Sequence, residues 1–169
     1  MNKLKLFLFV ALLLLCAVPA TAKNSDEEQT DKKTIKLLCF GNSFSMDVLC
    51  YVPFVMKNIA PDVDLTIAIA YNGGSSLVQH MANFSNRDVV QNGVTYSPKV
   101  YKLYKCTNAK PWTLLGSYDA NGVLFNDDWD IVTFQNATGT VRKSYGIYYE
   151  PYINNLCDSV VNKLGDEIK

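Results

Sequence analysis

Three short, continuous apolar runs limit the fold of this chain more than any other feature of its sequence. They span residues 34–40, 64–71 and 130–135, and each has the length of a strand buried on both faces. Apolar residues recur at helical spacing over residues 46–60, and a serine at 75 or 76 is expected to cap a helix that continues to about residue 84. This alternation of strand and helix predicts parallel strands joined by right-handed crossovers.

The expected architecture is a flavodoxin-like, three-layer α/β/α fold with a parallel sheet, in which the first strand lies between the second and the third. Pro53 is expected to kink the first helix, and an amphipathic helix over residues 148–164 follows the third strand. Residues 96–118 interrupt the alternation. They predict an inserted surface β-hairpin with its turn at 107–110, followed by a further turn at 119–122.

Polar residues follow the first and third strands, where such a fold has its switch point. Ligands of these folds bind at the carboxyl ends of the strands, at the place where the strand order reverses. Gly41-Asn42-Ser43 follows the first strand and Gln135-Asn136 follows the third. We therefore expect a site where these two segments meet.

The first 22 residues have the pattern of a secretory signal peptide. Two lysines precede an apolar run over residues 6–18, and small residues stand at 20–22, where a signal peptidase cleaves. The apolar run is shorter than the roughly 20 residues that a membrane-spanning helix needs. The pattern predicts export, either to the periplasm, to the cell surface or to the medium, with no membrane span.

The remainder of the chain is expected to hold one domain. Lipidation at Cys16 is disfavoured because Leu15 is larger than the small residue that such a site prefers. Residues 23–33 are polar and aperiodic, which predicts a solvated linker, and residues 34–169 are expected to form a single α/β domain.

Composition excludes several classes of function. Apolar residues make up 49% of the chain, which is far more than a disordered protein carries. Sixteen basic residues balance 16 acidic ones, so we expect no general attraction to nucleic acid. The sequence has no phosphate-binding loop and no cluster of metal ligands, and we expect neither a cofactor nor a metal. Nothing in it predicts an oligomeric state.

Four cysteines and one histidine limit the chemistry of the domain. Cys39, Cys50, Cys106 and Cys157 permit two disulfides in three connectivities in an exported protein, or they are free thiols. The apolar neighbours of Cys39 and Cys50 favour buried thiols. His80 is the only histidine, which disfavours a zinc site.

Three motifs in the order of the strands resemble the blocks of the SGNH (GDSL) hydrolase superfamily. Residues 41–45 (GNSFS) resemble its nucleophile block, and Asn42 stands where most members have aspartate. Residues 72–77 (NGGSSL) resemble its second block and residues 129–136 (WDIVTFQN) its third. The resemblance covers roughly residues 34–164 and is closer to a secreted bacterial branch whose function is unknown.

The resemblance implies a serine esterase. Ser43 would be the nucleophile, and the N–H of Gly74, or alternatively of Gly73, would help to bind the oxyanion of the transition state. A side-chain amide would complete the oxyanion hole, and the sequence does not decide between Gln135 and Asn136. Asn42 and Gly73 are further expected contacts of the substrate, which the resemblance makes an ester-bearing small molecule or an O-acylated polysaccharide.

The general base of the superfamily is missing from this sequence. Its late Asp-x-x-His block does not occur, and we expect an SGNH-type domain that is incomplete at its C-terminal end and has lost activity. His80 is expected along the helix that follows the second strand, which carries it away from Ser43. A structural role on a partly buried helix face is therefore favoured for His80.

Two other interpretations stay open at this point. In one, the protein binds carbohydrate without catalysis, and aromatic residues of the hairpin, Trp112 above all, stack on sugar rings. Packing of Tyr101, Tyr104 and Trp112 onto the sheet is the simpler account of the same residues. In the other, the protein is an active esterase whose base is His80 or a residue of a partner chain.

Overall fold

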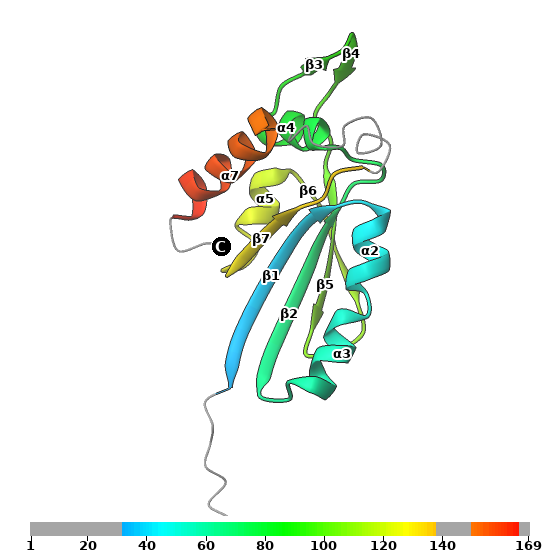
Figure 1. Cartoon of the computed structure of the whole chain (residues 1–169), viewed down its shortest axis with the longest axis vertical. Helices are drawn as coiled ribbons and strands as arrows, with labels where there is room; N and C mark the ends of the chain where they lie inside the picture. Colours follow the sequence, from blue (N-terminus) through cyan, green and yellow to red (C-terminus); the bar gives the residue numbers. More distant parts are fainter. Residues whose placement is uncertain (1–31, 138–149, 166–169) are drawn as a thin grey trace, which may run out of the picture. The chain divides into compact units, whose positions relative to one another are not determined.

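The computed structural model describes residues 32–137 and 150–165, so the predicted signal peptide and most of the predicted linker lie outside the described residues. The described residues build a five-stranded mixed sheet with the order β6-β5-β2-β1-β7 (Figure 1). Its strands are β1 (Lys33–Gly41), β2 (Val63–Tyr71), β5 (Tyr101–Thr107), β6 (Thr113–Tyr118) and β7 (Ile131–Phe134).

The centre of the sheet confirms the predicted strand order. β1 pairs in parallel with β2 on one side and with β7 on the other. The register sets Gly41 opposite Tyr71 and Phe40 opposite Phe134, so the carboxyl ends of the three strands lie at the same edge. The apolar runs of β1 and β2 follow from this arrangement, because a strand paired on both sides and covered on both faces must be apolar throughout, whereas β7 is the edge strand among the described residues and is partly exposed.

The predicted hairpin is present, but it belongs to the central sheet. β5 pairs antiparallel with β2, and β6 pairs antiparallel with β5. Without β5, β2 would expose an unpaired edge, and Tyr101 and Leu103 on β5 are fully buried against the core. The inserted hairpin predicted over residues 96–118 is therefore present, and it extends the central sheet instead of lying on its surface.

A second, smaller hairpin precedes β5 and was not predicted. Its strands are β3 (Val89–Gln91) and β4 (Val94–Tyr96). Asn92 and Gly93 join them with positive φ angles of 51° and 77°, which two-residue hairpin turns require.

The helices differ from the predictions at Pro53 and at residues 119–122. Two helices, α2 (Ser43–Leu49) and α3 (Val52–Ile59), replace one kinked helix, because proline has no N–H to donate and is best placed in a first turn. Asp119 accepts a hydrogen bond from Gly122 N and caps α5 (Ala120–Leu124), where only a turn was predicted. The other helices are α4 (Leu77–Ser85) and α7 (Glu150–Leu164).

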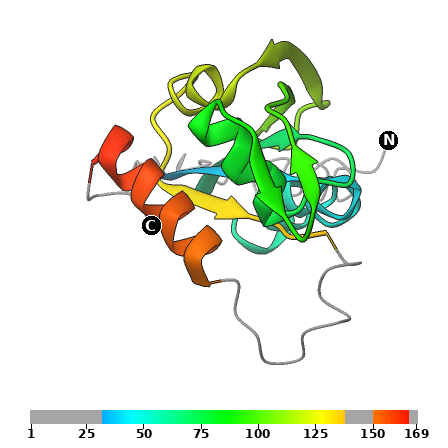
Figure 2. The ribbon, with the colours of Figure 1, turned by 90° about the horizontal axis from the view of Figure 1, so that it is seen from above.

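The helices cover both faces of the sheet and complete the predicted three-layer α/β/α fold. The helices α2 and α3 lie on one face, and α4, α5 and α7 lie on the other, with α4 beside α7 (Figures 1 and 2). Each face has its own buried apolar cluster. Among residues 32–137 and 150–165, no helix has the length and apolar character needed to cross a bilayer.

Candidate active site

The turn after β1 presents Ser43 at the start of α2. Asn42 is buried, and its side-chain oxygen accepts a hydrogen bond of 3.1 Å from Phe44 N, which caps the helix. Its amide nitrogen donates to the carbonyl oxygen of Ser75 at 3.1 Å. Both ends of the Asn42 side chain are thus engaged within the protein, while Ser43 beside it is exposed. Asn42 acts here as a link between two turns.

The turn after β2 lies against the turn after β1. Ser75 N donates to the carbonyl oxygen of Asn72 at 3.2 Å and closes a tight turn through the two glycines, while Asn72 N donates to the carbonyl oxygen of Gly41 at 2.9 Å. Gly74 has a φ of +67°, a left-handed conformation that an L side chain rarely adopts. Both glycines are exposed, so their backbone is accessible beside the loop of Ser43.

The segment after β7 meets the turns after β1 and β2, and we call the place where these three segments meet the junction. Gln135 N donates to the carbonyl oxygen of Phe40 at 2.9 Å, which extends the pairing of β7 with β1. The side-chain oxygen of Gln135 accepts a hydrogen bond from the hydroxyl of Ser45. The side-chain oxygen of Asn136 instead accepts from Leu77 N at 3.2 Å, at the first turn of α4. The two candidate amides therefore have different neighbours.

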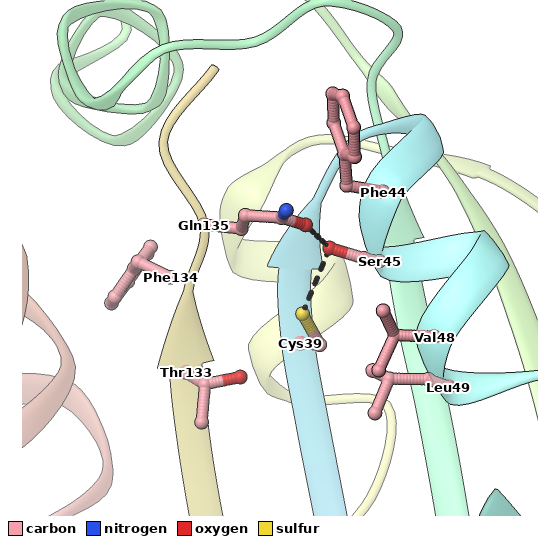
Figure 3. A pocket seen from close by; sticks show the side chains of 8 residues that line it. All are labelled: Cys39, Phe44, Ser45, Val48, Leu49, Thr133, Phe134 and Gln135. Carbon is pink, nitrogen blue, oxygen red and sulfur yellow. Dashed lines mark hydrogen bonds between the residues drawn. The ribbon is translucent and has the colours of Figure 1, made fainter. Parts of the chain in front are cut away.

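A cavity of about 220 Å³ opens between α2 and β7, next to this junction. Figure 3 shows Ser45 reaching from α2 across the end of β1 towards Gln135, with Cys39 below it. The walls of the cavity are otherwise mostly apolar. Its lining residues are Cys39, Phe44, Ser45, Val48, Leu49, Thr133, Phe134 and Gln135.

His80 is a buried structural residue in this fold. Its Nδ1 lies 2.8 Å from the hydroxyl of Tyr101 and its Nε2 lies 3.3 Å from the carbonyl oxygen of Gln135. A carbonyl oxygen can only accept, so Nε2 carries the proton and Nδ1 accepts from Tyr101. Burial lowers the pKa of His80 to about 4, against the smaller opposing effect of the Gln135 carbonyl. With both ring nitrogens engaged, His80 is not placed to deprotonate Ser43.

Trp112 is not brought to the junction. Its indole N–H donates to the carbonyl oxygen of Cys50 at 3.1 Å, and its ring packs against the apolar cluster under α2 and α3. Thr113, the next residue, pairs with Lys105, which in turn pairs with Ala68 in the middle of β2. The structure therefore gives Trp112 a place in the packing of the sheet, away from the strand ends.

All four cysteines of the domain are free thiols in the structure. Cys39 and Cys106 are buried, Cys50 is half-buried and Cys157 is exposed. The thiol of Cys39 donates to the hydroxyl of Ser45 at 3.4 Å, and the thiol of Cys106 donates to the carbonyl oxygen of Lys110 at 3.0 Å.

Ser45 is the residue of the junction that sequence reasoning missed. It is buried, whereas a serine in the first turn of a helix is ordinarily solvated. Gly41 was the available signal, because a Cβ at that position would overlap the Cβ and Oγ of Ser45. A glycine four residues before an inward-facing serine is the local condition for the close approach of α2 to the end of β1.

Comparison with known proteins finds a solved structure with a similar fold. No protein-family model and no curated protein matches the sequence. The crystal structure of a DUF4886 family protein from Bacteroides uniformis is similar, with a TM-score of 0.64 and 25% sequence identity. The match covers 80% of this chain and 48% of that chain, so this chain spans about half the length of the protein it matches.

Proposed function

We propose that the domain carries the serine and the oxyanion-binding groups of an SGNH-type ester hydrolase. The observation that supports this most is the exposed Ser43, which starts α2 at the point where the turns after β1, β2 and β7 are hydrogen-bonded to one another. A helix begins with N–H groups that have no partner within the helix, and the accessible Gly74 backbone lies in the neighbouring turn. Donors of this kind stabilise the developing oxyanion of an acyl transfer.

In this reaction, the Ser43 hydroxyl adds to the ester carbonyl and its proton passes to a general base. The tetrahedral intermediate then expels the alcohol, which takes the proton, and leaves an acyl group on Ser43. Water releases the acid in a second, equivalent step. His80, the only histidine, is enclosed by Tyr101 and Gln135, so it does not supply this base.

An ester on a small molecule or an acylated polysaccharide is the proposed substrate, and export by the predicted N-terminal signal peptide would bring the protein to such material. The resemblance of residues 41–45, 72–77 and 129–136 to the superfamily supports this substrate class. Carbohydrate binding without catalysis is the weaker candidate, because the ring of Trp112, which would stack on a sugar, packs against the apolar cluster under α2 and α3.

Chemical rescue tests the proposal directly. Imidazole in solution can replace a missing histidine, so it should accelerate acetylation of Ser43 by p-nitrophenyl acetate, and general-base assistance is commonly worth about 10²-fold or more. Because imidazole also hydrolyses this ester by itself, Ser43→Ala is measured at every imidazole concentration and subtracted. Ser117→Ala, an exposed serine on β6, is the matched control that should behave as wild type.

The expected result is an imidazole-dependent rate in wild type and Ser117→Ala that Ser43→Ala lacks. Mass spectrometry of the trapped protein should then find the acetyl group on the peptide that contains Ser43. Equal rates in wild type and Ser43→Ala across the imidazole series would contradict the proposal.

A further inference from the structure

The contacts of Ser45 carry an inference about how the oxyanion-binding group is held. Ser45 is 4% exposed and Cys39 is 5% exposed, so both side chains are largely withdrawn from solvent at the wall of the cavity. The Cys39 thiol donates to the Ser45 hydroxyl, and that hydroxyl donates to the side-chain oxygen of Gln135. The hydroxyl proton of Ser45 is therefore already used in a hydrogen bond within the protein, whereas Ser43, two residues earlier, is exposed.

The direction of these two hydrogen bonds, from Cys39 to Ser45 and from Ser45 to Gln135, fixes the orientation of the Gln135 amide. A side-chain amide has an acceptor oxygen on one side and a donor NH2 group on the other. Since the oxygen is held by Ser45, the NH2 group must face another way, and Figure 3 shows the amide nitrogen on the side turned from Ser45. The backbone of Gln135 is fixed as well, through its N–H to Phe40 and its carbonyl to His80.

Asn136 is engaged in a different task. Its side-chain oxygen accepts the N–H of Leu77, one of the first-turn donors of α4 that have no partner inside the helix. Ser76 caps the same helix by accepting from Gln79 N at 3.4 Å. The Asn136 oxygen thus serves the start of α4, whereas the Gln135 amide borders the cavity beside α2.

We propose that Ser45 is a positioning residue: its hydroxyl holds the oxygen of Gln135 so that the NH2 group of Gln135 is presented at the strand ends as the side-chain donor of the oxyanion hole. The catalytic part of this inference rests on the proposed function. Gly41 is required for this arrangement of Ser45 and Gln135, because any side chain at position 41 would displace Ser45 from the end of β1.

The orientation of the amide can be tested without any catalysis. In a ¹⁵N-labelled protein, the side-chain NH2 signals of Gln135 are assigned by their disappearance in Gln135→Glu. Ser45→Ala should shift these signals and bring them towards those of a mobile, solvated amide, while Ser117→Ala should leave them in place. Signals that are unchanged in Ser45→Ala would overturn the positioning role, whatever the enzyme assays show.

The catalytic consequence is tested in the imidazole-assisted acetylation of Ser43. Loss of one oxyanion donor costs about 10²-fold or more in rate, so Gln135→Ala should reduce the maximal rate by about that factor. Ser45→Ala should reduce it less, by about tenfold, with the KM for ester unchanged, because the donor is still present but no longer oriented. Gln135→Glu, which keeps an acceptor for Ser45 but has no NH2, should be as slow as Gln135→Ala.

A double-mutant cycle separates positioning from general loosening of the site. If Ser45 acts only through Gln135, then Ser45→Ala should have no further effect on the rate in a Gln135→Ala background. The proposal would be overturned if the rate of the double mutant fell by the product of the two single-mutant factors. It would also be overturned if Asn136→Ala reduced the acetylation rate while Gln135→Ala left it unchanged. If wild type shows no Ser43-dependent acetylation at all, the proposed function fails, and the NMR signals of Gln135 still decide the role of Ser45.

Discussion

The two faces of the sheet differ in how completely their apolar residues are enclosed. Under α4, α5 and α7, the aromatic ring of Phe40 is fully buried and contacts Phe84, Tyr101 and Phe134 at centroid distances of 4.9 to 5.1 Å. On the opposite face, α2 and α3 cover a smaller cluster and expose apolar side chains of their own. These exposed residues are Phe44, Val48, Tyr51, Phe54, Val55 and Ile59.

This difference shows how the candidate site is built. His80 belongs to the enclosed face and holds the carbonyl oxygen of Gln135, so the segment after β7 is anchored to the better-packed core. Ser43 and Ser45 belong to α2, the layer with less cover. The candidate site therefore joins a firmly held segment after β7 to a helix whose position depends on fewer contacts.

The largest expected effect is at the centre of the enclosed face. Phe40→Ala should destabilise the protein by about 3–5 kcal/mol, because it removes buried area and leaves a cavity among three aromatic rings. Phe44→Ala, at a position 44% exposed on α2, should cost less than about 1 kcal/mol. Urea unfolding measures the free energy of unfolding of both variants, provided that their m-values equal that of the wild type. Similar losses of stability at the two positions would show that the two faces are packed alike.

The pH dependence of His80 sharpens the same contrast. Burial lowers the pKa of His80 from 6.5 in the unfolded chain to about 4 in the folded protein, so the unfolded state binds more protons between these values. Stability should therefore fall as the pH drops from 6.5 towards 4, by about 3 kcal/mol in total at 1.36 kcal/mol per pKa unit. Below pH 4 the effect of this residue levels off.

Unfolding measured at pH 7, 5.5 and 4.5 tests this expectation. His80→Gln removes the titrating group and keeps a side chain that can donate to the Gln135 carbonyl and accept from Tyr101. The variant should be less stable at pH 7 but should lose less stability than wild type between pH 7 and 4.5. An identical slope in both proteins would place the acid sensitivity elsewhere.

The strand order was predictable because it depends on local signals. The apolar runs that end at Phe40, Tyr71 and Gln135 each predict a buried strand, and the turn residues after each run predict where the strand ends. Ser43 and the glycines at 73 and 74 were located at the strand ends by the same reasoning.

The remainder depended on contacts between residues far apart in the sequence. The hydrogen bond from Ser45 to Gln135 joins residues 90 positions apart, and no pattern within α2 indicates it. The pairing of β5 with β2, which makes the hairpin part of the central sheet, is likewise a contact between residues far apart in the sequence. Asp127 accepts hydrogen bonds from Lys36 on β1 and Lys105 on β5, a pairing that only the finished sheet creates.

The smallest expected effect is on the outward side of α3. Val55 is 53% exposed, so Val55→Ser removes little buried area and should change the free energy of unfolding by less than about 0.5 kcal/mol. Val123 on α5 is fully buried, and the same substitution there should cost several times as much, because it also buries a hydroxyl group. Urea unfolding of the two variants gives the comparison, and binding of an apolar dye to the native protein should decrease only in Val55→Ser. A loss at Val55 as large as that at Val123 would mean that the outward side of α3 is covered in solution, and that the two faces differ in what covers them rather than in how far they are covered.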